Sequence, residues 1–470
     1  MRMQRKAALC LALWAALTTA SSSVATTAAR ADEPVKPVPA VRPAVINDFP
    51  ENQTADTVLL MACAALGLLM IPAVGLFYGG MVRRKNVLSA FQQSFVLLGV
   101  VPVQWALAGY SLSFGPDVFA GLCGGWQWFG LQGVGLEPNV DLAARAPHQL
   151  FMVFQMLVAV LPAALIAGAI AERMKFASYL VFALLWTTFV YDPVAHWVWA
   201  PEGWIRHMGA LDFGGGLVIH LTSGLAALCC ALVLGQRKGL DHEDLHPHNL
   251  TLTALGTALL WFGWLGLDVG QAQARGTNTA ASAAFVATIL AGCAGILGWS
   301  LLEYFQKRKV TMLGACTGAI TGLVAVTPAA GYVTPVGALL LGSLVCPLCY
   351  GAILVKGKLG YDDSLDVFGV HGVGALFGVL ALGAVATPAL TGGAGGLLNG
   401  NADLFFAQAI AVAAVAAYTV IVTVVLLMLV DRVFGLRVSP EEEDLGLDLT
   451  QHGQRGYMMG EGELIGIDRN

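Results

Sequence analysis

Two histidines stand inside long apolar stretches of the chain, where an ionisable side chain is unusual. His220 lies in D-F-G-G-G-L-V-I-H-L-T-S-G (212–224), and His371 lies in D-V-F-G-V-H-G-V-G (366–374). Ionisable groups at bilayer depth are costly, and they commonly face a bundle interior or a water-filled path. An imidazole in a dry core must pair both ring nitrogens or leave a polar group unsatisfied, which costs roughly 2–7 kcal/mol.

Two imidazoles can satisfy each other, because a ring nitrogen of one donates and a ring nitrogen of the other accepts. Such a pair is neutral and shares one proton. It offers a passing molecule both a donor and an acceptor, and it can relay a proton. The alternative is a structural histidine bound to a backbone carbonyl. Metal ligation is disfavoured, because neither histidine has a Cys, His or Glu neighbour at helical spacing.

The composition is typical of a polytopic membrane protein rather than a soluble enzyme. Of the 470 residues 12% are charged, against roughly 25% in a soluble globular protein, and the mean hydropathy is +0.71. The 56 glycines favour close helix packing, and the net charge of −5 argues against nucleic acid as a partner. We interpret Cys346 and Cys349, in an apolar run, as small hydrophobes rather than a metal or redox pair.

The pattern of hydropathy predicts an all-α fold with eleven transmembrane helices. Apolar runs of about 20 residues alternate with short polar breaks, which is typical of membrane-spanning helices. The predicted spans are 56–79, 87–113, 147–170, 176–195, 213–235, 250–268, 277–305, 311–327, 332–354, 365–386 and 403–432.

The chain divides into four predicted parts. Residues 1–31 have the basic start, short apolar core and small-residue end of a cleavable signal peptide. Residues 32–55 are rich in proline and polar side chains and indicate an extracytoplasmic lead-in. Residues 56–432 form the eleven-helix domain, and residues 433–470 form a polar tail. On composition alone the tail is expected to be a solvated, disordered end.

Basic residues predict the orientation in the membrane. Every second loop carries a basic cluster, and by the positive-inside rule those loops are cytoplasmic. With eleven spans the N-terminus is then outside and the C-terminus inside, which agrees with the signal peptide. The clusters are Arg83-Arg84-Lys85, Arg173/Lys175, Arg237-Lys238, Lys307-Arg308-Lys309, Lys356/Lys358 and Arg432.

The two histidine segments suggest an internal repeat. His220 falls in the fifth predicted span and His371 in the tenth. An Asp and an aromatic-Gly element precede each histidine: 212–214 in the first segment, and Asp366 with 368–369 in the second. Five helices repeated in inverted topology, plus one extra helix, would bring both histidines near the midplane, where transport sites are common.

Other polar and aromatic residues have two readings each. Asp212 precedes the fifth span, where a carboxylate can cap a helix or attract an arriving cation. Trp199 and Trp204, on the same expected outer loop as His196, can be interface anchors or cation–π partners. His242, His246 and His248 cluster in an expected cytoplasmic loop, which we interpret as solvated.

Several motifs together resemble those of ammonium transporters of the Amt/Mep/Rh family. The resemblance covers about residues 56–460. The motifs, in order, are I-P-A-V-G-L-F-Y-G-G-M-V-R-R-K-N-V-L-S (71–89), A-H-W-V-W (195–199), G-A-L-D-F-G-G-G-L-V-I-H (209–220), H-P-H-N-L (246–250), L-G-A-C-T-G-A-I-T-G-L-V-A-V-T-P-A-A-G-Y-V (313–333), D-V-F-G-V-H-G-V-G (366–374) and L-G-L-D-L-T-Q-H-G (445–453).

The resemblance implies a homotrimer with one pore in each subunit and a pseudo-twofold repeat. It implies that His220 and His371 are the twin pore histidines, and that Asp212 and Trp199 recruit ammonium at an outer vestibule. Trp264 matches a tryptophan of the pore region. The tail would match a cytoplasmic segment that contacts PII-type nitrogen signal proteins.

Three positions depart from the family pattern. Members usually carry two stacked phenylalanines above the histidines, but the matching residues here are Val158, one turn after Phe154, and Leu267. The hydroxyl residue of the vestibule is replaced by Gln271. Aliphatic side chains still form a dry constriction but offer no cation–π face, whereas Gln271 still supplies a polar amide.

The sequence therefore predicts a transporter in the inner (plasma) membrane rather than an enzyme, without a cofactor or metal. NH4+ would collect outside, lose its proton, and cross as ammonia past His220 and His371. The altered constriction leaves two alternatives: an ammonium sensor that acts through a separate cytoplasmic partner, and a channel for another small neutral molecule such as CO2.

Overall fold

The computed structural model describes residues 53–240, 245–274, 278–393 and 395–457. Within these residues eleven helical segments are long and apolar enough to cross a membrane, as predicted. They are α2 (Gln53–Met81); α3 (Val87–Phe95), α4 (Leu97–Gln104), η2 (Trp105–Gly109) and α5 (Tyr110–Phe114); α6 (His148–Ile170); α7 (Phe176–Trp186), η4 (Thr187–Tyr191) and α8 (Asp192–Trp199); η5 (Gly216–Leu221) and α10 (Thr222–Leu234); α11 (Leu250–Ala274); α12 (Asn278–Lys307); α13 (Met312–Val326); α14 (Pro335–Leu359); η7 (Phe368–Gly372) and α15 (Val373–Val385); and α17 (Ala402–Phe434).

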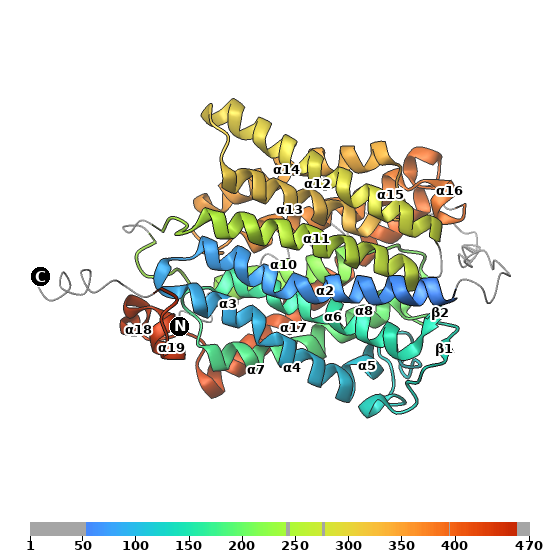
Figure 1. Ribbon diagram of the computed structural model, residues 1–470, viewed down its shortest axis with the longest axis horizontal. Helices are drawn as coiled ribbons and strands as arrows, with labels where there is room; N and C mark the ends of the chain where they lie inside the picture. Colours follow the sequence, from blue (N-terminus) through green and yellow to red (C-terminus); the bar gives the residue numbers. More distant parts are fainter. Residues whose placement is uncertain (1–52, 241–244, 275–277, 394, 458–470) are drawn as a thin grey trace, which may run out of the picture.

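The long helices run roughly side by side, and short elements cover both ends of the bundle (Figure 1). One end carries β1 (Pro138–Asn139), β2 (Ala143–Pro147) and α16 (Pro388–Thr391), with β1 antiparallel to β2. The other carries α18 (Pro440–Leu445) and α19 (Leu447–His452) and is called the tail end. Leu211, beside Asp212, bonds to Gln408 near the start of α17, which follows α16. The end with β1, β2 and α16 is therefore called the Asp212 end.

Both histidine-bearing spans start with a π-helical segment. His220 lies in η5 and His371 lies in η7, and each segment continues directly into an α-helix. A π-helical turn holds more residues than an α-helical turn, and such turns recur at functional sites. The hydropathy pattern predicts the span but carries no signal for this local change of helix type.

Small residues let neighbouring helices approach closely. On α11, a Cβ at Gly256 would lie 2.4 Å from the Phe77 backbone nitrogen, and a Cβ at Gly266 would lie 2.8 Å from the Cys63 carbonyl oxygen. Both partners belong to α2. In a membrane, where the surrounding lipid is as apolar as the side chains, such backbone contact is a main source of helix association.

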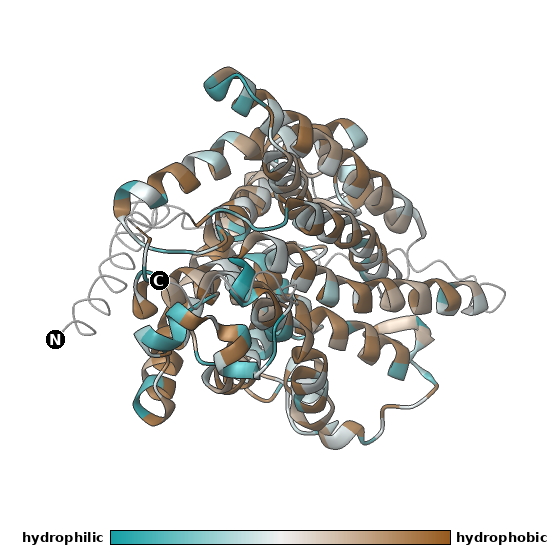
Figure 2. Cartoon of the chain, turned by 60° about the vertical axis from the view of Figure 1, so that its left-hand side comes forward, coloured by the Kyte–Doolittle hydropathy of each residue, from teal (hydrophilic) through white to brown (hydrophobic). Residues whose placement is uncertain are grey.

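The outer surface of the bundle is apolar, as a bilayer requires. Figure 2 shows hydrophobic residues along the helices and hydrophilic residues concentrated in loops and short terminal elements. Val103, Leu344 and Val425 are each more than half exposed. In water such side chains would be costly, so lipid is their expected surrounding.

The described part of the tail, residues 433–457, is ordered, which contradicts the disordered end expected from composition. Ser439 and Glu442 form a capping box that starts α18. The Asp448 carboxylate accepts a hydrogen bond from the Ser89 backbone nitrogen at 2.7 Å, and the Asn86 side chain accepts one from the Leu447 backbone nitrogen at 2.8 Å. Composition failed because polar groups of the tail pair with segments that are distant in the sequence.

A tail contact also corrects the interpretation of His248 as a solvated loop residue. Its Nδ1 lies 2.9 Å from the Val82 carbonyl oxygen, and its Nε2 lies 2.9 Å from the Tyr457 hydroxyl. His242 lies outside the described residues, as do the signal peptide and nearly all of the lead-in. Since α2 begins at Gln53, the last residues of the predicted lead-in are helical.

Candidate functional site

The two histidines meet in the centre of the bundle. The Nδ1 atoms of His220 and His371 are 3.2 Å apart, and the rings stack with centroids 5.2 Å apart and planes 19° from parallel. His220 is fully buried, and His371 is 4% exposed. One Nδ1 therefore donates while the other accepts, as predicted for a neutral pair.

Trp264 holds the pair from one side. Its ring stacks on His220 with centroids 5.1 Å apart, and its Nε1 donates to the Thr327 hydroxyl at 2.7 Å. Three rings thus form a stack across the bundle. Among the residues that the structure describes, His220 Nε2 has no hydrogen-bond partner.

An apolar cavity adjoins the histidine pair. Apart from the imidazoles, the Trp264 ring and the Tyr78 hydroxyl, its walls are aliphatic or phenyl, and the hydroxyl is already bound to the Leu165 carbonyl at 2.9 Å. No lining residue carries a fixed charge. The lining residues are Val74, Phe77, Tyr78, Leu161, Leu165, His220, Leu260, Trp264, Ile320 and His371.

A second apolar cavity lies beside the first, and Leu161 belongs to both. The structure brings together here the three residues of the predicted constriction, Phe154, Val158 and Leu267. The other lining residues are Gly67, Met70 and Leu157. The two cavities are therefore neighbours with largely apolar walls, and the histidines line the first of them.

Asp212 caps the helix that carries His220. Its Oδ1 accepts from the backbone nitrogens of Gly215 at 3.0 Å and Gly216 at 2.6 Å, and its Oδ2 accepts from those of Leu217 at 2.7 Å and Val218 at 3.2 Å. Burial raises the pKa of this carboxyl, and the four N–H donors oppose that rise. A carboxylate has about four lone-pair sites, so direct cation ligation has little room here.

Trp199 supports the same turn but does not lie on a loop, which corrects the prediction. It is the last residue of α8, it is 7% exposed, and its Nε1 donates to the Asp212 carbonyl oxygen at 3.0 Å. His196 is in the same helix, where its Nδ1 lies 3.1 Å from the Ser113 carbonyl oxygen. These contacts bury both rings instead of leaving them at the interface.

Gln271 pairs with a glutamine that the sequence reasoning missed. Gln155 Nε2 donates to Gln271 Oε1 at 3.3 Å, and both residues are 2% exposed. In the described part of the chain, Gln155 Oε1 and Gln271 Nε2 have no partner. Gln155 follows Phe154 directly, and this adjacency could have marked it. The pair leaves one acceptor and one donor unused.

A second aspartate, Asp363, reproduces the Asp212 device at the tail end. It stands eight residues before His371, as Asp212 stands eight before His220, and its Oδ2 accepts from the Phe368 backbone nitrogen at 2.7 Å. The predicted equivalent, Asp366, instead forms an ion pair with Lys356 at 2.5 Å. The correct signal was the spacing to the histidine, not the aromatic-Gly element.

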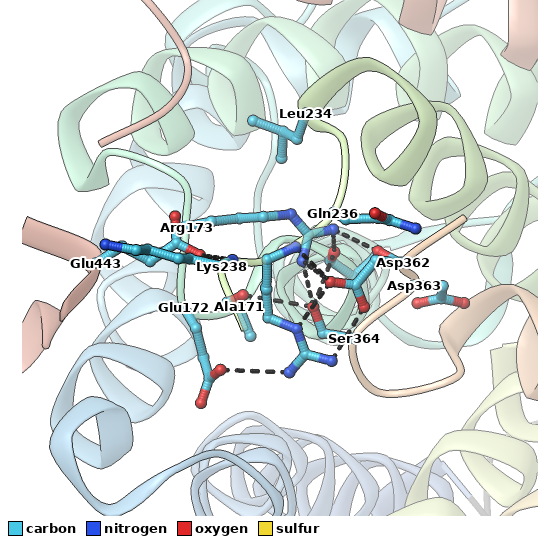
Figure 3. Close-up of polar contacts among 12 residues, drawn as sticks. Ala171, Glu172, Arg173, Leu234, Gln236, Lys238, Asp362, Asp363, Ser364 and Glu443 are labelled. Atoms are coloured by element: carbon cyan, nitrogen blue, oxygen red, sulfur yellow. Dashed lines mark hydrogen bonds and ion pairs between the residues drawn. The ribbon is translucent and has the colours of Figure 1, made fainter. Parts of the chain in front are cut away.

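Beside Asp363, two arginines converge on Asp362 (Figure 3). Arg173 Nη1 lies 3.3 Å from Asp362 Oδ2, and Arg237 Nε lies 2.9 Å from the same oxygen. Arg237 Nη1 also lies 3.3 Å from Glu172. Although burial opposes it, the Arg173 and Arg237 charges hold the pKa of Asp362 below its ordinary value.

The tail joins this ion-pair cluster. Glu443 accepts from the Lys238 backbone nitrogen at 2.6 Å and from Arg437 at 2.7 Å. The Val438 backbone nitrogen donates to the Arg173 carbonyl oxygen at 3.0 Å. The tail end is therefore a continuous polar structure that reaches from the tail to the cap of the helix with His371.

Fold and site define a class: a multi-pass membrane protein with two neighbouring apolar cavities and a buried imidazole pair. The sequence profile of the Ammonium Transporter Family matches residues 58–457. An ammonium transporter of Bacillus subtilis is 49% identical over 407 residues, 86% of this chain and 99% of the relative. Ammonium transporter Amt1 of Archaeoglobus fulgidus is 44% identical over 398 residues, 85% of this chain and 98% of the relative. The chain belongs to the ammonium transporter family.

Solved structures agree with this fold. Saccharomyces cerevisiae Mep2 superposes with a TM-score of 0.79 at 35% identity, over 87% of this chain and 92% of that chain. A protein described as a sensor Amt protein superposes with a TM-score of 0.77 at 25% identity, over 85% of this chain and 99% of that chain.

Proposed function

We propose that this protein carries ammonium nitrogen across the plasma membrane as neutral ammonia. The observation that carries the proposal is the hydrogen-bonded histidine pair beside two adjoining cavities without a charged wall residue. A bare cation in such a cavity loses its hydration and gains no counter-charge, which is strongly unfavourable. For neutral ammonia, the free-energy cost of entering the cavities is far smaller, and His220 Nε2 is available to form a hydrogen bond with it.

NH4+ is recruited at the Asp212 end of the bundle. Asp212 acts by its field, because four backbone N–H groups already occupy its oxygens. Trp199 fixes the position of this turn through the Asp212 carbonyl. Gln155 and Gln271 lie beside the constriction residues in sequence and supply the unused acceptor and donor to the arriving molecule.

Val158 and Leu267 form the constriction, with Phe154 beside them. Aliphatic walls exclude water as phenylalanine does, but they give no cation–π stabilisation. The proton of NH4+ is therefore lost before Val158 and Leu267 are passed. Beyond them, the imidazoles exchange hydrogen bonds with ammonia while the pair stays neutral.

The proposed topology rests on the distribution of basic residues, and the proposed assembly rests on the resemblance to the family. The basic clusters of Arg83, Arg173 and Arg237 lie with the tail at one end, so this end is cytoplasmic by the positive-inside rule. The N-terminus is outside, and the working unit is a homotrimer. The ordered tail is the surface for a PII-type nitrogen signal protein.

Flux measurements on proteoliposomes test the proposal. Purified protein is reconstituted around a pH-sensitive dye and exposed to an inward ammonium gradient, with empty liposomes as the control. We expect a flux well above that control. A flux equal to that of empty liposomes would contradict transport.

A sensor role is the second candidate, because the chain also superposes on a sensor Amt protein and its tail is docked against the helix caps. In that case ammonium binding would change the tail without net flux. Calorimetric binding of ammonium to trimers that give no flux in liposomes would favour the sensor; flux at the level of transporters excludes it as the main role.

A further inference from the structure

A second carboxyl group lies behind the Asp212 turn, and the proposed pore does not use it. Asp268 is on α11, one helical turn beyond Trp264, and it is fully buried. Its Oδ2 lies 2.6 Å from the Thr288 hydroxyl on α12. Within residues 53–240, 245–274, 278–393 and 395–457, its Oδ1 has no hydrogen-bond partner.

The backbone of Gly214 lies directly against that free oxygen. A Cβ built on Gly214 would be 2.3 Å from Asp268 Oδ1, so only glycine fits there. Gly214 is two residues after Asp212 and one before the first of the N–H donors that Asp212 binds. The two carboxyl groups therefore approach the same short turn, Asp212 from within it and Asp268 from behind.

The surroundings provide Asp268 with no counter-charge. The turn contributes Asp212, which is acidic; α12 contributes Thr288; and the 327–329 segment contributes Thr327, whose methyl would lie 2.8 Å from the same Cβ. No basic side chain of the described chain pairs with Asp268. Its own helix presents Trp264 and Gln271 nearby, both uncharged.

The hydrogen bonds of Thr288 point to a proton on Asp268. The Thr288 hydroxyl has one hydrogen and lies 2.6 Å from Asp268 Oδ2 and 2.7 Å from the Ala284 carbonyl oxygen. When that hydrogen goes to Ala284, the short contact to Asp268 needs a hydrogen from the carboxyl group. When it goes to Asp268, an ionised carboxylate would still be buried with one hydrogen bond and no cation, which is unfavourable.

We propose that Asp268 is a proton-binding site that holds the neutral carboxylic acid in the working protein and positions the Asp212 turn. As a neutral acid it packs against Gly214 and leaves Asp212 as the negative charge of that turn. When alkaline conditions remove the proton, the second charge repels Asp212 across Gly214 and displaces the Asp212 turn. Ammonium recruitment then falls because Asp212 no longer holds its position. Asp268 is a positioning residue, and its effect on transport rests on the proposed function.

Infrared difference spectroscopy of the reconstituted full-length protein tests the proton directly. The wild type minus Asp268→Asn spectrum is expected to contain the carbonyl-stretch band of a protonated carboxylic acid, which shifts in D2O. Thr288→Val removes the partner of Oδ2, so it should shift this band without removing it. If the wild type minus Asp268→Asn difference spectrum at neutral pH lacks this band, the proposal is overturned, whether or not the protein transports ammonium.

Transport supplies a second readout that a purely structural role would not change. Asp268→Asn keeps the shape and a hydrogen-bond donor but cannot ionise, so we expect it to transport methylammonium like the wild type at neutral pH. Above neutral pH, the ratio of variant to wild-type uptake should rise at least about twofold as the wild type acquires the second charge. If uptake by Asp268→Asn and by the wild type changed with pH in parallel, the positioning role would be overturned. If Asp268→Asn fails to assemble, the shift of the carboxylic acid band in Thr288→Val becomes the test: a shifted band supports the protonated Asp268, and an unchanged band overturns it.

Discussion

At the Asp212 end, a carboxylate caps η5 and stands eight residues before His220; at the tail end, Asp363 caps η7 at the same spacing before His371. The surroundings of the two caps differ. Asp212 is bound by four backbone N–H groups and faces the neutral residues Trp199 and Gly214. Asp363 lies beside the cluster of Arg173, Arg237 and Asp362, which the tail contacts.

This difference indicates a division of work within a common design. The Asp212 end offers a carboxylate held by backbone N–H groups, and its negative field suits the arrival of a small cation. The tail end holds its cap in a network that extends to the tail, which suits mechanical coupling to a cytoplasmic partner. Each of the following predictions tests whether the two ends are as unlike as their surroundings.

The largest effect is expected from Asp362→Asn at the tail end. This change leaves Arg173 and Arg237 buried beside a neutral amide, and breaking a buried ion pair costs about 3–5 kcal/mol. Thermal unfolding of the purified protein should show a large fall in Tm. Lys238→Met, which removes the exposed pair with Asp444, is the control and should leave Tm unchanged. Equal Tm values for Asp362→Asn and the control would contradict a structural network.

The next largest effect is expected from Asp212→Asn, on transport. Loss of the charge weakens four hydrogen bonds of a kind worth about 1.5–3 kcal/mol each, so uptake should fall by at least about 100-fold. Asp363→Asn, the matched change at the tail end, weakens the contact with the Phe368 backbone nitrogen and should lower uptake by less than about 10-fold. Similar losses of uptake in Asp212→Asn and Asp363→Asn would contradict the proposed functional difference between the two ends.

Neighbouring carboxyls at the tail end should respond to pH with opposite signs. Burial raises the pKa of Asp363 to about 6 from 3.8, so its proton is bound more tightly in the folded state, and its contribution to stability falls as pH rises from about 4 to 6. Asp363→Asn should therefore gain about 1–3 kcal/mol relative to the wild type over this range.

Asp362 should do the reverse, because its pKa is held below 3.8. Its ion pairs stabilise the fold above that value and are lost as the pH falls through the lowered pKa. The penalty of Asp362→Asn should therefore shrink in acid. Tm values of both variants between pH 3 and pH 7 provide the measurement, and two profiles with the same sign would refute the assignment.

The smallest effect is expected from Trp264→Phe. The change removes the hydrogen bond to Thr327, worth about 1 kcal/mol, but keeps a ring to stack on His220. Uptake should fall by about fivefold. Trp261→Phe, on the same helix and packed toward Gly292 of α12, is the matched control. An equal loss in both variants would show that the hydrogen bond from Trp264 to Thr327 has no special role.

Hydropathy predicted the fold well because it is set by the bilayer. All eleven spans were confirmed, and the span of α6 ends at Ile170 as predicted. Periodicity could not predict the π-helical starts of the two histidine spans, because both helix types leave the same hydropathy pattern. It also stopped the fourth span at 195, whereas α8 continues to Trp199.

The site was predictable in part. The meeting of His220 and His371 followed from the repeat, and Val158 and Leu267 do line one cavity. The role of Asp363 was assigned to Asp366, because a motif was compared instead of the spacing to the histidine. The docked tail was missed on composition, since side chains that pair with distant backbone groups cannot be recognised from local sequence.

The central claim is that ammonium nitrogen passes the His220–His371 pair. Uptake of labelled methylammonium by proteoliposomes of the His220→Ala/His371→Ala double variant tests it most directly, with trimer assembly verified by size-exclusion chromatography. Removal of both imidazoles leaves the apolar path without its hydrogen-bonding groups, and we predict at least about a 100-fold loss of specific uptake, equal to about 3 kcal/mol. Uptake by the assembled double variant at the wild-type rate would contradict the claim.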